Sequence, residues 1–261
     1  MSAVETIELV PFNQAGMGLS DALQQSIPEQ IASRSVHETD FEYFSNVRAE
    51  DSVFIDVGPN IGNSAVSISN RCEGARIYGF EPNLILESLL REAKSHNPNF
   101  SVQMIGLGET EAEFNLFIPV LGSTLIVGES SLLRDHFDSA FVQARLRSYG
   151  PNQKLRLTSV KCQISTLDAQ AAIFEAAARA RWRFLKIDVE GAELSVLKGA
   201  TAFITRFRPT LLIEEGHRAE LAQFLVGYGY SRYMLDRAGN RLVEACSATT
   251  LNSFYQYRPK L

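Results

Sequence analysis

Short apolar runs alternate with amphipathic stretches along most of the chain. The nearly unbroken apolar runs predict strands that are buried on both faces, at residues 53–57, 76–80, 102–105, 184–189 and 210–214. Apolar positions at helical spacing predict helices at residues 19–33, 64–71, 85–95, 169–181, 193–207 and 218–228. Two late apolar runs, at residues 230–236 and 252–257, are expected to form an antiparallel edge. We therefore expect an α/β fold, with a mostly parallel sheet between two layers of helices.

Three regions depart from this alternation. Residues 1–50 are irregular apart from one predicted helix, and we interpret them as an N-terminal cap on a main domain at 51–261. Residues 114–118 alternate between apolar and polar, which predicts a strand paired at an edge or in a local hairpin. Residues 120–158 are polar and punctuated by glycine and proline around one predicted helix at 139–147. Such an insertion is either a lid or substrate loop, or a solvated excursion.

Composition and charge narrow the choice of partners. The chain has 261 residues, 45% of them hydrophobic, which suffices for one large domain with a buried core. Its net charge is -5 and it has no basic run, so nucleic acid is not an expected partner. It shows neither a signal peptide nor a stretch that would span a membrane, so we expect a cytoplasmic protein without a membrane partner. Cys72, Cys162 and Cys246 lack metal-binding spacing and are expected to be buried thiols in a reducing compartment.

The turn at residues 56–62 is the first candidate for a ligand site. Asp56 ends the first predicted strand, and Gly58 and Gly62 lie four residues apart with Asn60 between them. A turn of this kind lets a cofactor lie against the backbone at the carboxyl end of a parallel strand. After glycine, asparagine is the residue that best tolerates left-handed backbone. An acid that ends a buried strand is costly without a partner, so we expect Asp56 near the ligand.

The same turn selects among cofactors. A dinucleotide fingerprint requires glycine where this chain has Asn60 and Asn63, so that reading is disfavoured. Pro59 has no N–H and weakens a nest of phosphate-binding amides. A ligand with an amino-acid tail and no phosphate fits better, and S-adenosylmethionine is such a ligand. Its ribose needs a hydrogen-bond acceptor, which Glu81 provides at the end of the second predicted strand; alternatively, Glu81 only caps the following helix.

Two other positions allow both a ligand role and a structural one. Gly106 opens a Gly-Leu-Gly turn after the third predicted strand, where an adenine ring would lie, although ordinary turn chemistry explains its glycines equally well. Lys186 lies inside an apolar strand and needs a buried partner, for which Asp56 and Asp168 are the candidates.

Six motifs, in this order, resemble the FkbM family of methyltransferases. They lie at residues 56–62 (DVGPNIG), 80–82 (FEP), 165–168 (STLD), 185–193 (LKIDVEGAE), 196–200 (VLKGA) and 208–214 (RPTLLIE). Pro59 replaces the alanine that is usual in the family, which implies a slightly stiffer turn. The resemblance implies a class I methyltransferase fold, a Rossmann-like three-layer α/β/α sandwich. It also implies S-adenosylmethionine as donor and methylation of a hydroxyl on a small metabolite, polyketide or sugar, so that the partner is a small-molecule or glycan acceptor.

Methyl transfer to an aliphatic hydroxyl needs a base or a metal, because the hydroxyl is a poor nucleophile. The candidates lie where the fourth and fifth predicted strands end, at the edge of the sheet that binds ligands. They are Asp188, Glu190, Glu214 and His217, with His217 as the candidate general base. Asp188 with Glu214 is alternatively a Mg²⁺ site, because both offer hard oxygen ligands, and metal dependence stays open. Glu193 and Lys198 are expected on a solvated helix face.

Two other functions stay open. One is a nucleic-acid or protein methyltransferase of the same fold, and the other is a non-catalytic module that binds S-adenosylmethionine. Base-modifying enzymes usually carry an Asn/Asp-Pro-Pro-aromatic turn after the fourth strand, where this chain has residues 188–191 (DVEG). The intact motifs at the first, second and fourth predicted strands argue against a loss of catalysis. No motif within the insertion identifies the acceptor.

Overall fold

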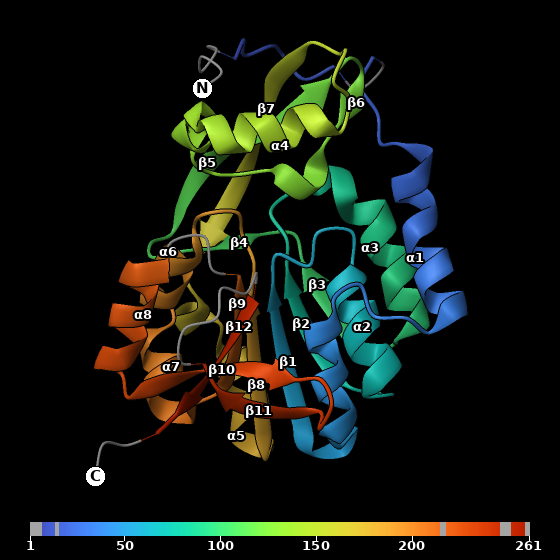
Figure 1. Cartoon of the computed structure of the whole chain (residues 1–261). Helices are drawn as coiled ribbons and strands as arrows, with labels where there is room; N and C mark the ends of the chain where they lie inside the picture. Colours follow the sequence, from blue (N-terminus) through green and yellow to red (C-terminus); the bar gives the residue numbers. More distant parts are fainter. Residues whose placement is uncertain (1–6, 14–15, 215–217, 246–251, 259–261) are drawn as a thin grey trace.

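An eight-stranded sheet forms the centre of the molecule (Figure 1). The computed structural model describes residues 7–13, 16–214, 218–245 and 252–258. In spatial order the strands are β11 (Arg241–Glu244), β10 (Tyr230–Asp236), β12 (Asn252–Tyr257), β9 (Thr210–Glu214), β8 (Trp182–Ile187), β1 (Ser52–Val57), β2 (Arg76–Phe80) and β3 (Phe100–Gln103). The strands from β9 to β3 are parallel, and β12 runs antiparallel to both β9 and β10. The predicted antiparallel edge is confirmed, with β11 as a strand that the sequence pattern missed.

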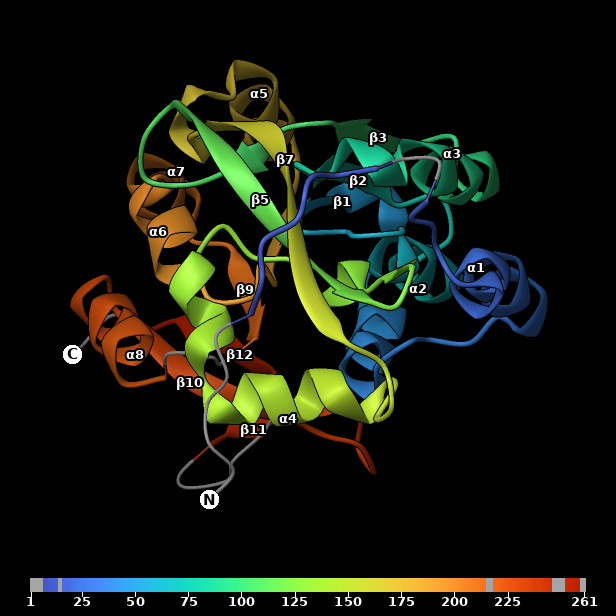
Figure 2. The same ribbon diagram turned by 90° about the horizontal axis from the view of Figure 1, so that it is seen from above.

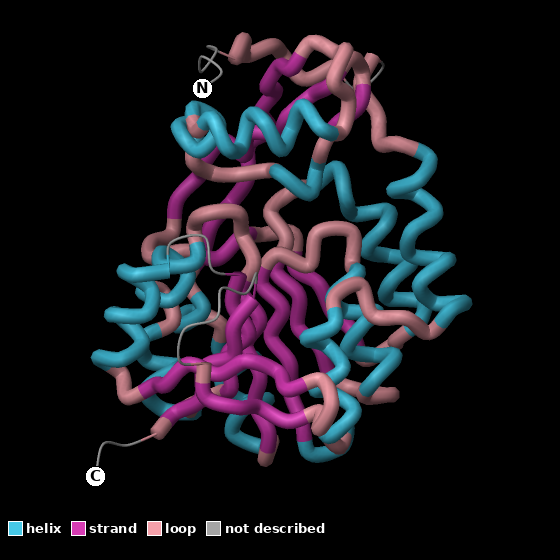
Figure 3. Tube along the Cα trace, viewed as in Figure 1, coloured by secondary structure: helices cyan, strands magenta, loops and turns pink. Residues whose placement is uncertain are grey.

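Helices cover both faces of this sheet, as Figure 3 shows, and confirm the predicted three-layer α/β/α sandwich. One layer contains α1 (Asp21–Ser33), α2 (Asn63–Arg71) and α3 (Glu87–His96), and the other contains α5 (Ala171–Arg179), α6 (Glu193–Lys198), α7 (Thr201–Phe207) and α8 (Arg218–Gly227). Short 3-10 turns link them: η1 (Thr39–Asn46), η2 (Ala49–Asp51), η3 (Leu84–Leu86) and η6 (Leu167–Ala169). All six residues of β1 are buried. Because strand side chains alternate, Phe54 joins the core under α1–α3, while Val53 and Ile55 join the core under α5–α8.

Two details differ from the expected elements. The third strand lies at Phe100–Gln103, shifted toward the N-terminus from the predicted 102–105. The single helix predicted at 193–207 is wrong, because α6 and α7 are separate helices. The Asp168 carboxylate accepts hydrogen bonds from two N–H groups in the first turn of α7, at 2.8 and 2.9 Å, and so begins a new helix there.

A second sheet rises above the carboxyl ends of the central strands (Figure 1). Its strands, in spatial order, are β4 (Gly106–Leu107), β7 (Leu155–Ser165), β5 (Ala112–Leu121) and β6 (Thr124–Leu125), and it carries η4 (Val127–Glu129), η5 (Arg134–Asp138) and α4 (Ala140–Ser148). β5 and β7 pair antiparallel along their whole lengths. The predicted strand at 114–118 is therefore part of a longer pair in a separate sheet, and the second sheet extends on both sides of the predicted insertion at 120–158.

The N-terminal segment connects the two sheets. Leu9 forms a bridge with Leu157 of β7, and α1 packs against α2 and α3. Phe41 and Phe44, in η1, are almost completely buried in the core of the central sheet. Cys72 and Cys162 are buried free thiols, whereas Cys246 lies outside the described residues. Among the helices of the described ranges, none combines the length and the apolar character that a membrane crossing requires.

Candidate functional site

A cavity of about 440 Å³ lies at the carboxyl ends of the central strands. Seen from above, β5, β7 and α4 extend over this end of the sheet (Figure 2). The floor of the cavity includes Val57 of β1, Phe80 of β2, Asp188 just after β8, and Glu214 of β9. Its size is typical of a site for a small molecule, and its place is the edge at which open parallel sheets bind ligands.

The turn between β1 and α2 forms one side of this cavity. Gly58, Asn60 and Gly62 all have left-handed backbone, with φ values of 75°, 53° and 106°. The expectation that Asn60 accepts this conformation is confirmed. A Cβ on Gly58 would lie 2.0 Å from the carbonyl oxygen of Asp188, so a side chain at this position would displace the turn from β8.

Glu81 holds the turn from the end of β2. Its two carboxylate oxygens accept hydrogen bonds from the backbone N–H of Asn60 at 3.0 Å and of Asn83 at 2.8 Å. The side chain lines the cavity, and burial raises the pKa of Glu81 to about 7. Each oxygen has a further lone pair, so this contact is compatible with the predicted ribose role.

The Lys186 side chain extends from β8 and binds the turn from beneath. Its ammonium donates to the carbonyl oxygen of Gly58 at 2.7 Å and lies 3.3 Å from Asp56 and 3.4 Å from Asp188. Burial opposes its charge, but Asp56 and Asp188 together raise the pKa of Lys186 above its usual value, so it remains an ammonium. The predicted partnership with Asp56 is confirmed. The alternative partner, Asp168, is wrong, because that carboxylate caps α7.

Asp56 itself is completely buried. Beside the ion pair with Lys186, it accepts a hydrogen bond from the Ser64 hydroxyl at 2.5 Å, at the start of α2. It is not among the described residues that line the cavity. Its place is therefore beneath the turn, where it holds both Lys186 and α2, and its predicted contact with the ligand stays a prediction.

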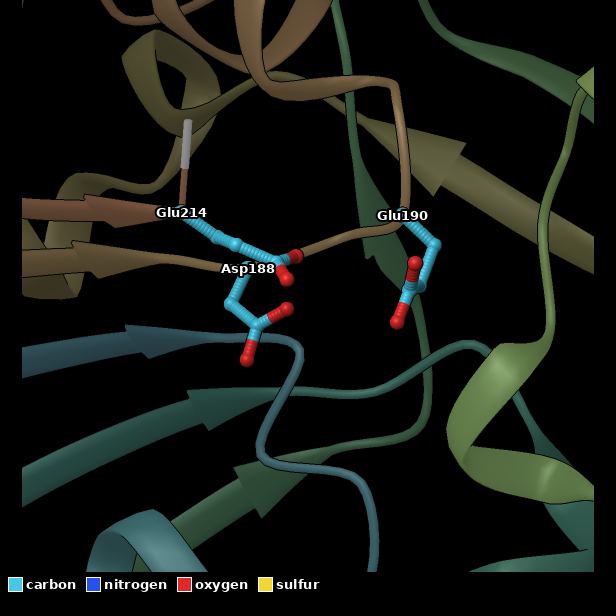
Figure 4. A group of neighbouring side chains, drawn as sticks. All are labelled: Asp188, Glu190 and Glu214. Carbon is cyan, nitrogen blue, oxygen red and sulfur yellow. The ribbon is translucent and has the colours of Figure 1, made fainter. Parts of the chain in front are cut away.

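Three carboxyl groups meet on the side of the cavity that faces the turn (Figure 4). One oxygen from each of Asp188, Glu190 and Glu214 lies within 4.8 Å of the others. Burial and the neighbouring carboxylates raise the pKa of Glu214 to about 9, with a hydrogen bond to Asp188 adding to the shift. Glu214 is therefore protonated at neutral pH and donates to Asp188. Burial and the charges of Glu129 and Asp188 raise the pKa of Glu190 to about 7.

The second sheet supplies the roof above these carboxyl groups. Arg145 of α4 forms ion pairs with Glu129 and, at 3.2 Å, with Glu190. The Tyr149 hydroxyl donates to Glu129 at 3.0 Å, and the Ser131 hydroxyl donates to the backbone oxygen of Glu190 at 2.9 Å. Glu190 has a φ of 51°, a conformation that non-glycine residues rarely adopt, and such strain is often found at functional sites.

Sequence reasoning missed Glu129, Arg145 and Tyr149 altogether. The helix that carries Arg145 was predicted, but its spacing does not show which face meets the cavity. His37 and Glu38, from the N-terminal segment, also line the cavity and were missed for the same reason. A local pattern cannot identify such residues, because their partners lie far away in the sequence.

Of the remaining candidates, Gly106 lies where the sequence expects it, in the lining of the cavity. His217 lies outside the described residues. Glu193 is not on a solvated face, since it is buried and accepts hydrogen bonds from two backbone N–H groups of residues 189–191, at 3.2 and 3.0 Å. Lys198 is half-exposed and pairs with Glu109 at 3.3 Å.

The architecture defines a class of protein. A mostly parallel sheet between helices, with β12 antiparallel to its neighbours near one edge, and a cavity between a glycine turn after β1 and an acid after β2 together form the class I methyltransferase fold. A family model described as the methyltransferase FkbM domain matches residues 56–242, which is more than half of the chain. The chain therefore belongs to the FkbM methyltransferase domain family, as its motifs predicted.

Two curated relatives are similar in sequence. The AMB antimetabolite synthetase AmbE of Pseudomonas aeruginosa is 26% identical over 196 residues, which are 65% of this chain and 9% of that protein. Methyltransferase 1 of Beauveria bassiana is 28% identical over 153 residues, 58% of this chain and 59% of that protein. The chain thus spans less than two thirds of either relative. A solved FkbM methyltransferase from Methylobacillus flagellatus aligns with a TM-score of 0.46 and 16% identity, over 91% of this chain and 60% of that one.

Proposed function

We propose that the chain transfers a methyl group from S-adenosylmethionine to a hydroxyl oxygen of a small-molecule or glycan acceptor. The observation that carries the proposal is the arrangement of one cavity between the turn after β1 and the three carboxyl groups after β8 and β9. The first side suits a cofactor that lies against bare backbone, and the second side suits removal of a proton. Both lie in a chain of the FkbM family.

The charges in the cavity fit this cofactor. The described lining includes six carboxyl groups and two cations, Arg145 and Lys186, both of which are already paired with carboxylates. Such a site repels phosphate and favours a ligand with a sulfonium and an ammonium group. We assign the backbone of the turn at Gly58 and Asn60, the Glu81 carboxylate and the space beside Gly106 to the nucleoside. When bound, S-adenosylmethionine supplies an electrophilic methyl group.

Glu190 is the residue that we assign as the general base. A base works best when its pKa is near the operating pH, and the pKa of Glu190 is about 7. Glu214 is protonated at neutral pH, and Asp188 both accepts the Glu214 hydrogen bond and pairs with the buried Lys186, so neither is as free to take a proton. Arg145 fixes the Glu190 carboxylate from above and keeps it aimed at the cavity.

A magnesium ion on the three carboxyl groups is the alternative that the sequence left open. Three hard oxygen ligands within 4.8 Å of one another are suitable in type and spacing. One contact favours the base over the metal, because Arg145 already pairs with Glu190 at 3.2 Å.

The proposal is tested by binding and by transfer, measured separately. We expect calorimetry to show that S-adenosylhomocysteine binds the full chain at micromolar levels. We also expect tritium to pass from methyl-labelled S-adenosylmethionine to an alkali-stable product, as an ether is, in the polar small-molecule extract of the source cells. A folded chain that gives no binding heat contradicts the cofactor. Label that is found only in nucleic acid or protein contradicts the acceptor.

A further inference from the structure

The N-terminal segment places two polar side chains, His37 and Glu38, in the wall of the cavity. They lie between α1 and η1, outside residues 56–242 that the family model matches. Lys186 and Asp188, at the end of β8, act electrostatically on both of them. The pair therefore faces the carboxyl end of β8, where the proposed transfer takes place.

Ser67 of α2 determines which nitrogen of the His37 ring carries the hydrogen. The Ser67 hydroxyl accepts from the Gln30 side-chain amide at 2.7 Å and from the His37 backbone N–H at 3.0 Å, and these two donors occupy both lone pairs. The amide atom of Gln30 that faces Ser67 is the nitrogen, because the same atom lies 3.1 Å from the carbonyl oxygen of Asn63, which accepts from the amide N–H but not from the amide oxygen. The Ser67 hydroxyl has one hydrogen of its own, and its oxygen lies 2.8 Å from Asn63 O and 2.9 Å from His37 Nδ1, the two groups that could accept it. With no lone pair left on Ser67, Nδ1 cannot donate, so a neutral ring carries its hydrogen on Nε2.

The His37 ring is neutral under ordinary conditions. Burial and the nearby Lys186 ammonium lower its pKa to about 4, against a smaller opposing effect of Asp188. The Glu38 carboxylate is the other charge beside it, with 3.8 Å between His37 Nε2 and Glu38 Oε2. That distance is too long for a hydrogen bond. The Nε2 hydrogen is therefore available to a ligand.

Glu38 is held in place next to this donor. Its Oε2 accepts a hydrogen bond from the side-chain amide of Asn252, on β12, at 2.6 Å. The side-chain contacts of Glu38 within the described residues involve Oε2, which leaves Oε1 as an acceptor for a ligand. The segment thus presents one hydrogen-bond donor and one acceptor, side by side, from two fixed side chains.

We propose that His37 and Glu38 bind the methyl acceptor and determine its specificity. His37 Nε2 donates to an oxygen of the acceptor molecule, and the Glu38 carboxylate accepts from a hydroxyl group next to it. The proposal rests on the proposed methyl transfer and deepens it. It assigns recognition to the N-terminal segment and leaves proton removal to Glu190. A neutral donor beside a carboxylate selects a neutral hydroxylated molecule over an anion.

The test compares variants that differ by one hydrogen bond. His37→Leu removes the donor, Glu38→Gln removes the charge, and His37→Gln restores an N–H close to the position of Nε2. We expect the first two to lower tritium transfer into a subsaturating source-cell extract by about tenfold each, as the loss of one hydrogen bond to the acceptor implies. His37→Gln should recover most of that rate. The matched controls are His96→Leu and Glu50→Gln, a histidine and an acid that are not among the described residues lining the cavity.

Binding of S-adenosylhomocysteine separates this proposal from its rivals. We expect its affinity to stay within twofold in every variant. A loss of affinity that parallels the loss of transfer overturns the proposal, because the pair would then hold the cofactor. Unchanged transfer in both His37→Leu and Glu38→Gln overturns it as well.

A second measurement does not require an acceptor. Ring ¹⁵N NMR of the full chain, with the His37 signal identified by its absence in His37→Gln, should show a neutral ring with hydrogen on Nε2 at pH 6. A ring with hydrogen on Nδ1 overturns the assignment. A chain that binds S-adenosylhomocysteine and transfers no label to the extract contradicts the proposed function itself, and the ring measurement then still decides the role of His37 as a donor.

Discussion

The cavity has two sides that are built in different ways. The loop wall, residues 58–62 with Glu81, is held by backbone groups and by one buried lysine. The insertion wall, Glu129, Arg145 and Tyr149, is held by side-chain ion pairs and a hydroxyl that meet above Glu190. A backbone turn tolerates little change, because its left-handed positions admit few residue types. Side-chain pairs, by contrast, can be exchanged while the sheet beneath them stays the same, so the insertion wall tolerates more change than the loop wall.

The largest effect is expected on the rate of methyl transfer, at Glu190, which the insertion wall holds. Glu190→Gln keeps the shape of the side chain but removes the base, so methyl transfer should fall by about 10²–10⁴-fold. Binding of S-adenosylhomocysteine should change little, because the loop wall is untouched. Single-turnover transfer and calorimetry measure the two quantities. The control is Glu109→Gln, a surface acid that pairs with Lys198. A variant with the rate of the unaltered chain would assign the proton to another group.

The next effect concerns the stability that Lys186 gives to the loop wall. Lys186→Met removes the cation between Asp56 and the Gly58 carbonyl and leaves a buried carboxylate unpaired. We expect the free energy of unfolding to fall by about 3–5 kcal/mol, measured by urea denaturation. Lys198→Met, at a half-exposed pair, should change it by no more than about 0.5 kcal/mol. Equal losses of unfolding free energy in the two variants would mean that the buried contacts of Lys186 stabilise the chain no more than a surface ion pair does.

A smaller effect tests the ribose role of Glu81. Glu81→Gln should weaken binding of S-adenosylhomocysteine by more than about tenfold, since a charge-assisted hydrogen bond becomes a neutral one. Calorimetry at constant pH measures this, with the exposed Glu87→Gln as the matched control. If affinity is unchanged while thermal stability falls, Glu81 serves only to hold the turn at Asn60.

The carboxyl groups also predict how stability depends on pH. The pKa of Glu190 is raised to about 7 and that of Glu214 to about 9, so the folded state holds protons that the unfolded state has already released. The free energy of unfolding should therefore fall as the pH rises from about 5 to about 9. Glu214→Gln should flatten the upper part of this decline. Stability that rises over the same range, in urea titrations at several pH values, is the contrary result.

No effect is expected from metal removal. If Arg145 and a proton neutralise the carboxyl groups, dialysis against EDTA should leave the transfer rate within twofold. Loss of transfer in EDTA, with recovery in magnesium but not in sodium, would assign Asp188, Glu190 and Glu214 to a metal ion instead.

The loop wall was largely predictable from sequence, and the insertion wall was not. Asn60 in left-handed backbone, the pairing of Lys186 with Asp56, and the place of Gly106 beside the cavity all follow from residue types next to predicted strands. Glu193 was misplaced, because helical spacing alone does not show that its carboxylate turns back onto two backbone N–H groups. The break between α6 and α7 was missed because the capping group, Asp168, comes from another element.

The sequence by itself determined the alternation of strands and helices, the glycine turn and the acids at the strand ends. These features depend on local backbone preference and on the burial of neighbouring residues, which a linear pattern records. Only the tertiary structure decided that β5 pairs with β7 above the sheet, that Arg145 reaches Glu190, and that His37 enters the cavity. Those contacts join residues distant along the chain. Their energy depends on distance, desolvation and charge in three dimensions, for which no short stretch of sequence carries a signal.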